Sequence, residues 1–310
     1  MIIIEAILSP TFFSIRSPES FQVAETLLLP PPSTIAGAFA FSYALWKNEN
    51  FIESLKKLAK NAWYFSVPLS PIVLSSVILS RSRLMQVEKR KIKKKDIMKI
   101  VSRSDYRKLE SQGLLDKIRY RYQLLDALWK IKSPTYWKYY LNTFFDAMVR
   151  RYVFTTSLYI AGLVNVDERF TLCFSRMGDT ESMINVREIA FIEDYDLETL
   201  KQGEECRTES YAFTTYGNTK VATASGDYTL QQMTGPMFLL ERIEKRRKIS
   251  HIGSCALPLK RVIKRIGSKE ISAYEPSSFS VEVLTESKLL SYRSKLLNSN
   301  INVIIPKGGM

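Results

Sequence analysis

Alternating and β-branched hydrophobic positions recur along most of the chain and predict a β-rich body. The expected strands cover residues 2–8, 63–79, 152–166, 170–174, 279–284 and 301–305, with an extended segment at 11–21 and a hairpin at 211–228. Pro68 and Pro71 interrupt the second of these strands. Because proline donates no ladder hydrogen bond, we expect that strand to lie at the edge of a sheet.

Helical spacing of hydrophobic residues follows three consecutive prolines at residues 30–32. The prolines hold the backbone extended and mark the entry to the helix. Ser33 or Thr34 is expected to cap that helix. The mostly small side chains of residues 36–40 would let it pack closely against a sheet. A second, shorter helix is expected at residues 50–60.

Residues 81–151 form the longest helical pattern and carry almost all of the excess positive charge. The window holds 20 Lys and Arg against 7 Asp and Glu, in a chain whose net charge is +14. Few glycines or prolines occur before Pro134, so the window is predicted to be a helical insertion that projects from the β-rich body. An acidic stretch, residues 167–209, has 12 carboxylates against 5 basic residues. It suits either docking to a basic subunit or shielding of the insertion.

Aromatic residues are interleaved with the charges of this window. They are Tyr106, Tyr120, Tyr122, Trp129, Tyr136, Trp137, Tyr139 and Tyr140. Cationic side chains neutralise phosphates and aromatic faces stack on unpaired bases, so RNA or single-stranded DNA is the favoured partner. The candidate phosphate contacts are Arg81, Arg83, Lys89, Arg90, Lys93, Lys94, Lys95, Arg119 and Arg121. As alternatives, the basic run at residues 89–95 would be a solvated helix face or a nuclear-type address, and the aromatic rings would be the core of the insertion.

Composition and the absence of several motifs argue against other classes. A hydrophobic share of 45% with 12% aromatics is typical of a folded protein. The three cysteines are far apart, which fits neither a disulfide framework nor a zinc site. HExxH, GxxxxGK[ST] and GxSxG motifs are missing. No signal peptide or membrane-spanning segment is predicted, so we expect a soluble, cytoplasmic protein.

His251 is the only histidine, and hence the only imidazole available for acid/base chemistry near neutral pH. It lies in an alternating segment, residues 249–257. That setting favours an ordinary strand residue over a catalytic one, because general acid/base catalysis needs partners that the sequence does not identify. We therefore expect no catalytic residue, no metal and no cofactor.

Three short motifs together resemble a known family. They are Arg16-Ser-Pro18, Leu29-Pro-Pro-Pro-Ser-Thr-Ile-Ala-Gly-Ala38 and Ser175-Arg-Met-Gly-Asp-Thr-Glu-Ser182. In this combination the chain resembles the CRISPR-associated Cas-five family of the RAMP superfamily. The RxGxxES form of the third motif is most similar to that of the archaeal type I-A Cascade subunit. The motifs cover under a quarter of the chain.

The resemblance implies a non-catalytic subunit that caps one end of a Cascade effector. Such a subunit holds the five-prime handle of the CRISPR RNA and contacts the RAMP backbone subunit and the large subunit, with target DNA or RNA as a further candidate partner. By motif match, the handle-binding residues are Arg16, Ser33, Thr34, Gly37, Arg176, Gly178 and Glu181. The basic insertion occupies the place of the thumb of such proteins, although compact relatives have a short β-hairpin there.

Pattern and resemblance together predict an α+β fold. Residues 1–200 would form a ferredoxin-like, RRM-related RAMP domain that includes the basic helical insertion at residues 81–151. Residues 201–310 would form a smaller, C-terminal, β-rich part. Three alternatives stay open: the related capping subunit of a type III effector, a metal-independent endoribonuclease that processes CRISPR RNA, and a structural adaptor without RNA contact.

Overall fold

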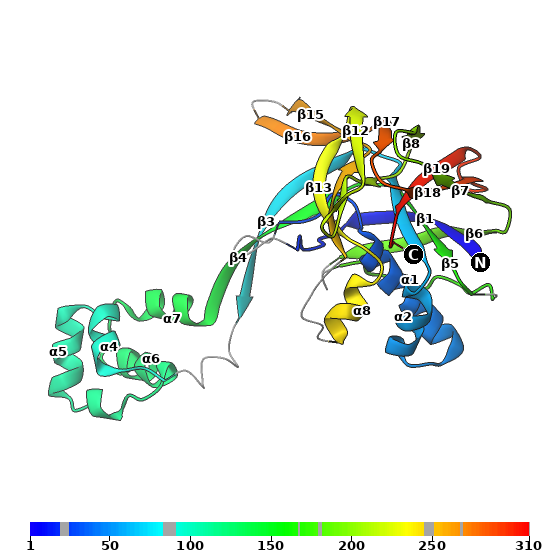
Figure 1. Ribbon diagram of the computed structural model, residues 1–310. Helices are drawn as coiled ribbons and strands as arrows, with labels where there is room; N and C mark the ends of the chain where they lie inside the picture. Colours follow the sequence, from blue (N-terminus) through cyan, green and yellow to red (C-terminus); the bar gives the residue numbers. More distant parts are fainter. Residues whose placement is uncertain are drawn as a thin grey trace. The chain divides into compact units, whose positions relative to one another are not determined.

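The structure is a computed structural model and describes residues 1–18, 25–82, 91–166, 168–178, 182–244, 251–266 and 269–309 (Figure 1). The chain divides into two compact units: Met1–Ser76 with Arg151–Met310, and Val77–Arg150. We call them unit 1 and unit 2. The chain enters unit 2 within strand β3 (Ile72–Ser82) and leaves it within β4 (Phe145–Phe154). Unit 2 is therefore inserted into unit 1, and the expected boundary between residues 200 and 201 stays a prediction.

A four-stranded antiparallel sheet forms the centre of unit 1. Its strand order is β2-β5-β1-β6, made of β1 (Ile2–Phe12), β2 (Trp63–Pro68), β5 (Leu158–Val164) and β6 (Met183–Ile192). Both β1 and β2 run antiparallel to β5, which lies between them, so they are parallel to each other. Every residue of β2 and β5 is buried. Burial on both faces explains why these two strands lack the polar alternation of a half-exposed sheet.

Helices α1 (Pro32–Lys47) and α2 (Phe51–Ala59) connect β1 to β2, and α1 begins at a different cap from the one predicted. The N-cap is Pro31, in extended conformation and without a side-chain capping bond, and Pro32 is the first helical residue. The fixed φ of proline suits this position, where its missing N–H is not needed. Ser33 and Thr34 lie inside the first turn, so the prediction that one of them caps α1 is wrong.

The remaining strands form further antiparallel sheets, in the orders β19-β18-β7, β12-β17-β8, β13-β14-β9 and β15-β16-β3-β4, with a β10-β11 hairpin. Their bounds are β7 (Asp196–Leu200), β8 (Glu205–Thr208), β9 (Ala212–Phe213), β10 (Thr215–Tyr216), β11 (Thr219–Lys220), β12 (Ala222–Gly226), β13 (Thr229–Thr234), β14 (Ile252–Leu257), β15 (Leu259–Ile266), β16 (Lys269–Pro276), β17 (Phe279–Val283), β18 (Ser287–Arg293) and β19 (Asn300–Pro306). A short helix, α8 (Phe238–Ile243), packs beside α1 and α2.

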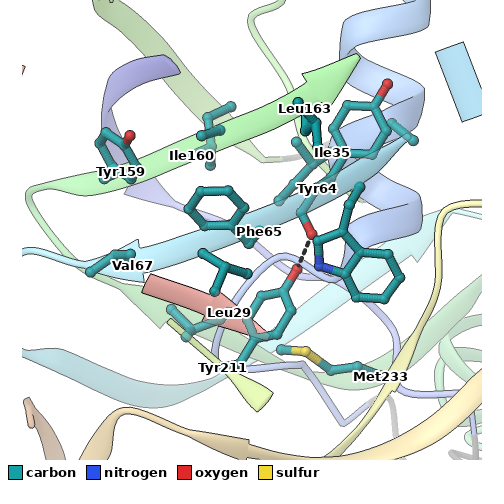
Figure 2. Packing of buried hydrophobic residues seen from close by; sticks show 14 of the residues in the cluster. Leu29, Ile35, Tyr64, Phe65, Val67, Tyr159, Ile160, Leu163, Tyr211 and Met233 are labelled. Carbon is teal, nitrogen blue, oxygen red and sulfur yellow. Dashed lines mark hydrogen bonds between the residues drawn. The ribbon is translucent and has the colours of Figure 1, made fainter. Parts of the chain in front are cut away.

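A single hydrophobic core runs through unit 1 (Figure 2). It includes Leu29 of the proline-rich segment, Ile35 of α1 and Tyr64 of β2, all fully buried. The hydroxyl of Tyr211 donates a hydrogen bond to the backbone oxygen of Tyr64 at 2.7 Å, which joins the later part of the chain to the central sheet. This packing fixes the proline-rich segment, and therefore the start of α1, against β2.

The buried carboxylate of Glu5 ties the first strand to the end of the chain. It accepts hydrogen bonds from the backbone N–H groups of Lys295 and Leu296, at 2.9 and 3.0 Å, and from the hydroxyl of Tyr159. The Tyr159 hydroxyl also hydrogen-bonds that of Tyr292. A fully buried carboxylate needs such partners, because it has lost its hydration. Residues 287–306 are therefore held on the same core as β1 and β5.

Unit 2 is helical (Figure 1), and it has a hydrophobic core of its own. Its elements are α4 (Lys94–Ile100), α5 (Arg103–Ser111), a 3₁₀ turn (Leu115–Lys117), α6 (Arg121–Lys130) and α7 (Tyr136–Phe144). Ile97, Leu109, Leu124 and Leu128 are completely buried in it. Leu124 and Leu128 are four residues apart and so share one face of α6.

The fold combines helices with antiparallel sheets, in agreement with the α+β prediction. Residues 63–79 do not form one strand. They form β2, which ends at Pro68, and most of β3, which begins after Pro71, and β2 lies at the edge of the central sheet as predicted. The strand predicted at residues 170–174 is wrong. Phe170, Leu172 and Phe174 are buried alternately, as in a strand, but the Cys173 N–H donates to the Ser42 hydroxyl of α1 at 3.0 Å rather than to a neighbouring strand.

Candidate nucleic-acid interface

A pocket of about 830 Å³ lies in unit 1, and segments far apart in the sequence form its wall. Its lining comes from residues 15–18 and 174–178, from Leu27 and Phe51, from Pro31, Ser33, Thr34, Gly37, Ala38 and Phe41, and from Thr234, Phe238, Leu239, Arg242 and Ile252. The lining includes the predicted motif residues Arg16, Ser33, Thr34, Gly37, Arg176 and Gly178. The seventh, Glu181, lies outside the described residues. The structure thus brings six motif residues together, and their binding of RNA stays a prediction.

Gly178 and Ser182 explain why the third motif lies beside the first. Gly178 has a φ of +94°, and a Cβ at this position would lie 2.4 Å from the backbone oxygen of Ser14. The Ser14 N–H donates to the hydroxyl of Ser182 at 3.2 Å. Both contacts hold the RxGxxES segment against the backbone two residues before Arg16. Arg176 and Arg16 consequently line the same pocket.

The first motif is also joined to the proline-rich segment. The N–H of Ile15 donates to the hydroxyl of Thr26 at 3.0 Å, and the Leu27 N–H donates to the Ile15 oxygen at 2.8 Å. Arg16 and Thr26 form an isolated antiparallel bridge. Residues 14–17 therefore lie between the segment that leads into α1 and the RxGxxES segment.

Ser33 and Gly37 take part in packing. The Ser33 hydroxyl, which is buried, hydrogen-bonds the Thr234 hydroxyl on β13. A Cβ on Gly37 would lie 3.2 Å from the side chain of Leu239 on α8, so the glycine allows close approach of the two helices. Thr34 is less buried, and its N–H donates to the Pro31 oxygen at 2.9 Å. The motif therefore shapes the pocket wall, with Thr34 as its more accessible hydroxyl.

The pocket is positively charged and partly aromatic. Arg16, Arg176 and Arg242 line it and are exposed, whereas no Asp or Glu occurs among its described lining residues. Arginine's fork of N–H donors suits phosphate oxygens, and phenylalanine faces can stack on bases. The lining phenylalanines are Phe41, Phe51, Phe174 and Phe238. Arg242 was missed from the sequence, where its only signal was the basic stretch at residues 241–269.

The predicted phosphate contacts of unit 2 are described only in part. The side chains of Arg83, Lys89 and Arg90 lie outside the described residues, and Arg81 is described only as a backbone position of β3. Lys93, Lys94, Lys95 and Arg119 are exposed and Arg121 is half-buried. The N–H of Ile92 donates to the Arg119 oxygen at 2.9 Å, so the middle of the basic run at residues 89–95 lies beside the residues that precede α6.

Lys94 differs from its neighbours because it forms an ion pair with Asp116. The hydrogen bond between the two raises the pKa of Lys94 and lowers that of Asp116. For Lys93 and Lys95, no ion pair falls within the part of the chain that the structure describes. Phosphate contact is therefore more readily available to Lys93 and Lys95 than to Lys94.

His251 lies outside the pocket lining. Its Nδ1 atom hydrogen-bonds the Tyr216 hydroxyl at 2.7 Å, and its Nε2 atom is 3.6 Å from a carboxylate oxygen of Glu241. Within the described ranges, no three His, Cys, Asp or Glu side chains are grouped so that they could hold a metal ion. The helices in those ranges also include none with the length and apolar character needed to cross a bilayer.

Comparisons with known proteins find only weak similarity, among solved structures. No protein-family model matches the chain, and no curated protein matches it at a significant level. Among solved structures, the chain is similar to one described as the crystal structure of a CRISPR protein from Archaeoglobus fulgidus. The two are 12% identical over 98% of this chain and 99% of the other, with a TM-score of 0.42. At this TM-score the likeness is too weak to carry an argument about fold or function.

Proposed function

We propose that the chain is a non-catalytic RNA-binding subunit of a cytoplasmic, CRISPR RNA-guided effector complex, and that its unit 1 pocket holds the five-prime handle of the RNA. The observation that carries the proposal is the convergence of three motif segments, spread over about 160 residues of sequence, on one arginine-lined pocket whose described lining residues include no carboxylate. Each motif is a feature of the local sequence and does not depend on the fold. Their meeting at one place is what a shared binding role requires.

The central sheet supports the RAMP part of this proposal. Strands β1 and β2 are parallel, separated by β5 and connected through α1 and α2, which is a split β-α-β unit of the ferredoxin-like kind. A ferredoxin-like domain has a second helix before its fourth strand. Between β5 and β6, the described residues 165–166, 168–178 and 182 include no helix. The ferredoxin-like assignment therefore rests on the first half of the motif.

The chemistry of the pocket suits a nucleotide in a bent, unpaired strand. Arg16, Arg176 and Arg242 would bind phosphate oxygens, and the half-exposed ring of Phe41 would stack on a base. The hydroxyl of Thr34 would add a hydrogen bond. Ser33 and Gly37 would act indirectly, by holding α1 in place.

Handle binding is tested with the double variant Arg16→Ala/Arg176→Ala. The probes are an RNA with the repeat-derived handle at its five-prime end and an RNA of the same composition with the handle at its three-prime end. We expect the wild-type protein to prefer the first RNA, and the variant to bind it at least tenfold more weakly, because each charge-assisted hydrogen bond contributes about 1.5–3 kcal/mol. Fluorescence anisotropy measures both affinities.

Arg207→Ala/Arg293→Ala is the matched control, since both arginines are exposed in unit 1 and absent from the pocket lining. It should bind the handle RNA within about twofold of the wild type, because surface charges away from the contact contribute little. Equal affinity of the pocket variant and this control would reject the pocket as the handle site.

The endoribonuclease alternative makes a different prediction. A metal-independent nuclease would cleave repeat RNA in the presence of EDTA, and His251→Ala would abolish the cut. We expect intact RNA instead. Isolation of the native complex and identification of its proteins would separate the type I from the type III assignment, and would show whether the backbone and large subunits are partners.

A further inference from the structure

Unit 2 exposes large aromatic side chains that its own core does not use. Trp129 on α6 is 61% exposed and Trp137 on α7 is 62% exposed. By contrast, Tyr139 is 7% exposed and belongs to the core of unit 2. The structure thus divides the aromatic rings of residues 81–151 into a buried group and an exposed group. The sequence pattern alone did not distinguish these two groups.

The two exposed tryptophans form one continuous cluster of rings with the half-buried Tyr136 and Tyr140. The ring centroid of Tyr136 is 5.0 Å from that of Trp129, 5.2 Å from that of Trp137 and 5.9 Å from that of Tyr140. The Trp137 and Tyr140 centroids are 5.8 Å apart. We call these four residues the aromatic surface. Tyr136 and Tyr140 also pack against the core, so they fix the two tryptophans from below.

A buried polar network positions the turn before α7, the helix that carries three of these four residues. The carboxylate of Asp105 on α5, only 1% exposed, accepts hydrogen bonds from the hydroxyls of Ser133 and Thr135 at 2.8 and 3.0 Å. The Thr135 N–H donates to the Ser133 hydroxyl at 3.1 Å. These residues immediately precede Tyr136, the first residue of α7. The aromatic surface is therefore held in a defined position.

The charges around the aromatic surface are mostly positive. Lys132 and Lys138 are exposed, and neither ammonium group forms a hydrogen bond or an ion pair within the described ranges of the chain. Asp126 is paired with Lys130 at 2.8 Å, one turn along α6. Exposed aromatic faces with available lysines beside them are complementary to single-stranded nucleic acid, whose bases and phosphates are both accessible.

We propose that Trp129, Tyr136, Trp137 and Tyr140 stack on unpaired bases of single-stranded nucleic acid, and that Lys132 and Lys138 contact its phosphates. This inference rests on the proposed RNA-binding function and assigns it a second contact, separate from the pocket of unit 1. Stacking is tolerant of sequence, because every base has an aromatic face. The aromatic surface therefore binds the strand without specificity for its base sequence.

Tryptophan fluorescence gives a direct test. The chain has four tryptophans, of which Trp63 is fully buried and Trp46 is 47% exposed on α1 of unit 1. Lys47, which lies over the Trp46 ring, is paired with Glu168, so that site lacks an available cation. Oligouridine should quench the fluorescence of the wild type and of Trp46→Phe, but not that of Trp129→Phe/Trp137→Phe.

Affinity measurements decide between stacking and other roles. Trp129→Ala/Trp137→Ala should bind oligouridine about five- to hundredfold more weakly, and should bind an RNA duplex of the same length as well as the wild type does. Trp129→Phe/Trp137→Phe should keep most of the affinity, because phenylalanine still offers an aromatic face on which a base can stack. The alanine variant should retain its preference for a five-prime handle, whereas the pocket variant Arg16→Ala/Arg176→Ala should lose that preference. The two measurements therefore test the aromatic surface and the pocket separately.

Two results would overturn the inference. Unchanged oligouridine binding by the alanine variant would show that bases do not stack on this surface. If the same variant also lost protein partners from the native complex, the aromatic surface would be a protein interface instead.

Discussion

At the scale of single residues, Gly178 shows how a residue without a side chain positions a charged one. Its φ of +94° is open to glycine and strained for other residues, and its α-carbon lies against the Ser14 backbone. The contact brings Arg176, two residues earlier, to the pocket that Arg16 lines. Backbone conformation and packing thus explain why glycine occupies this position of the RxGxxES motif, without a direct contact to RNA.

We predict that Gly178→Ala lowers the free energy of unfolding by more than the backbone strain alone. Strain at such a φ costs about 1–3 kcal/mol, and the clash with Ser14 adds to it. Gly203→Ala is the matched control, since Gly203 has a φ of +87° with no atom within 4 Å of its Cβ position. Urea unfolding measures both variants. Equal losses would show that the approach to Ser14 does not constrain the chain.

At the scale of elements, Asp105 links α5 to the start of α7. Burial would raise the pKa of Asp105, but hydrogen bonds from Ser133, Ser102 and Thr135 outweigh burial and lower it. The Asp105 N–H in turn donates to the Ser102 hydroxyl, which caps α5. One carboxylate thus holds both the cap of α5 and the turn before α7.

We predict that Asp105→Asn destabilises unit 2 at neutral pH by about 1–3 kcal/mol, because the amide satisfies the three hydroxyls less well. The folded pKa of Asp105 lies below its unfolded value of about 3.9, so the stabilisation is present above that value and is lost as pH falls through the folded pKa. The stability difference between wild type and variant should therefore shrink below about pH 4.

Urea unfolding at several pH values measures this effect. Asp126→Asn, an exposed change on α6, should cost well under 1 kcal/mol at every pH. A pH-independent cost of Asp105→Asn would contradict the role given to its charge.

Local sequence patterns predicted elements better than they predicted contacts. The prolines at residues 30–32 located the start of α1, but the cap was wrong because Pro32 itself begins the helix. The alternation of hydrophobic residues at 170–174 predicted their burial correctly. Strand formation also requires a neighbouring strand to pair with, and a local pattern does not show whether one is present. The pocket depends on contacts such as Ser14 with Gly178, between residues far apart in sequence. Arg242 joins it only through the position of α8, and no motif marks that residue.

At the scale of the whole molecule, the proposed contacts with RNA differ in physical kind. The arginines of the pocket and the lysines of unit 2 act through charge, whereas the aromatic surface acts through stacking. Charge contacts release counterions from the nucleic acid, so their contribution depends on salt. Stacking contributes to affinity with little dependence on salt. Salt dependence can therefore separate the two contributions without knowledge of how the units are arranged.

We predict that the slope of log K against log salt for single-stranded RNA becomes shallower by about 1.4 in Lys93→Gln/Lys95→Gln, since each phosphate contact contributes about 0.7. Lys94→Gln is the internal control and should change the slope less per charge, because Asp116 already compensates Lys94. Trp129→Ala/Trp137→Ala should lower log K at every salt concentration and leave the slope as it is. Titrations at several salt concentrations measure all three. Slopes that stay at the wild-type value in both lysine variants would mean that this part of unit 2 touches no phosphate, and the lysine run would then be a solvated face.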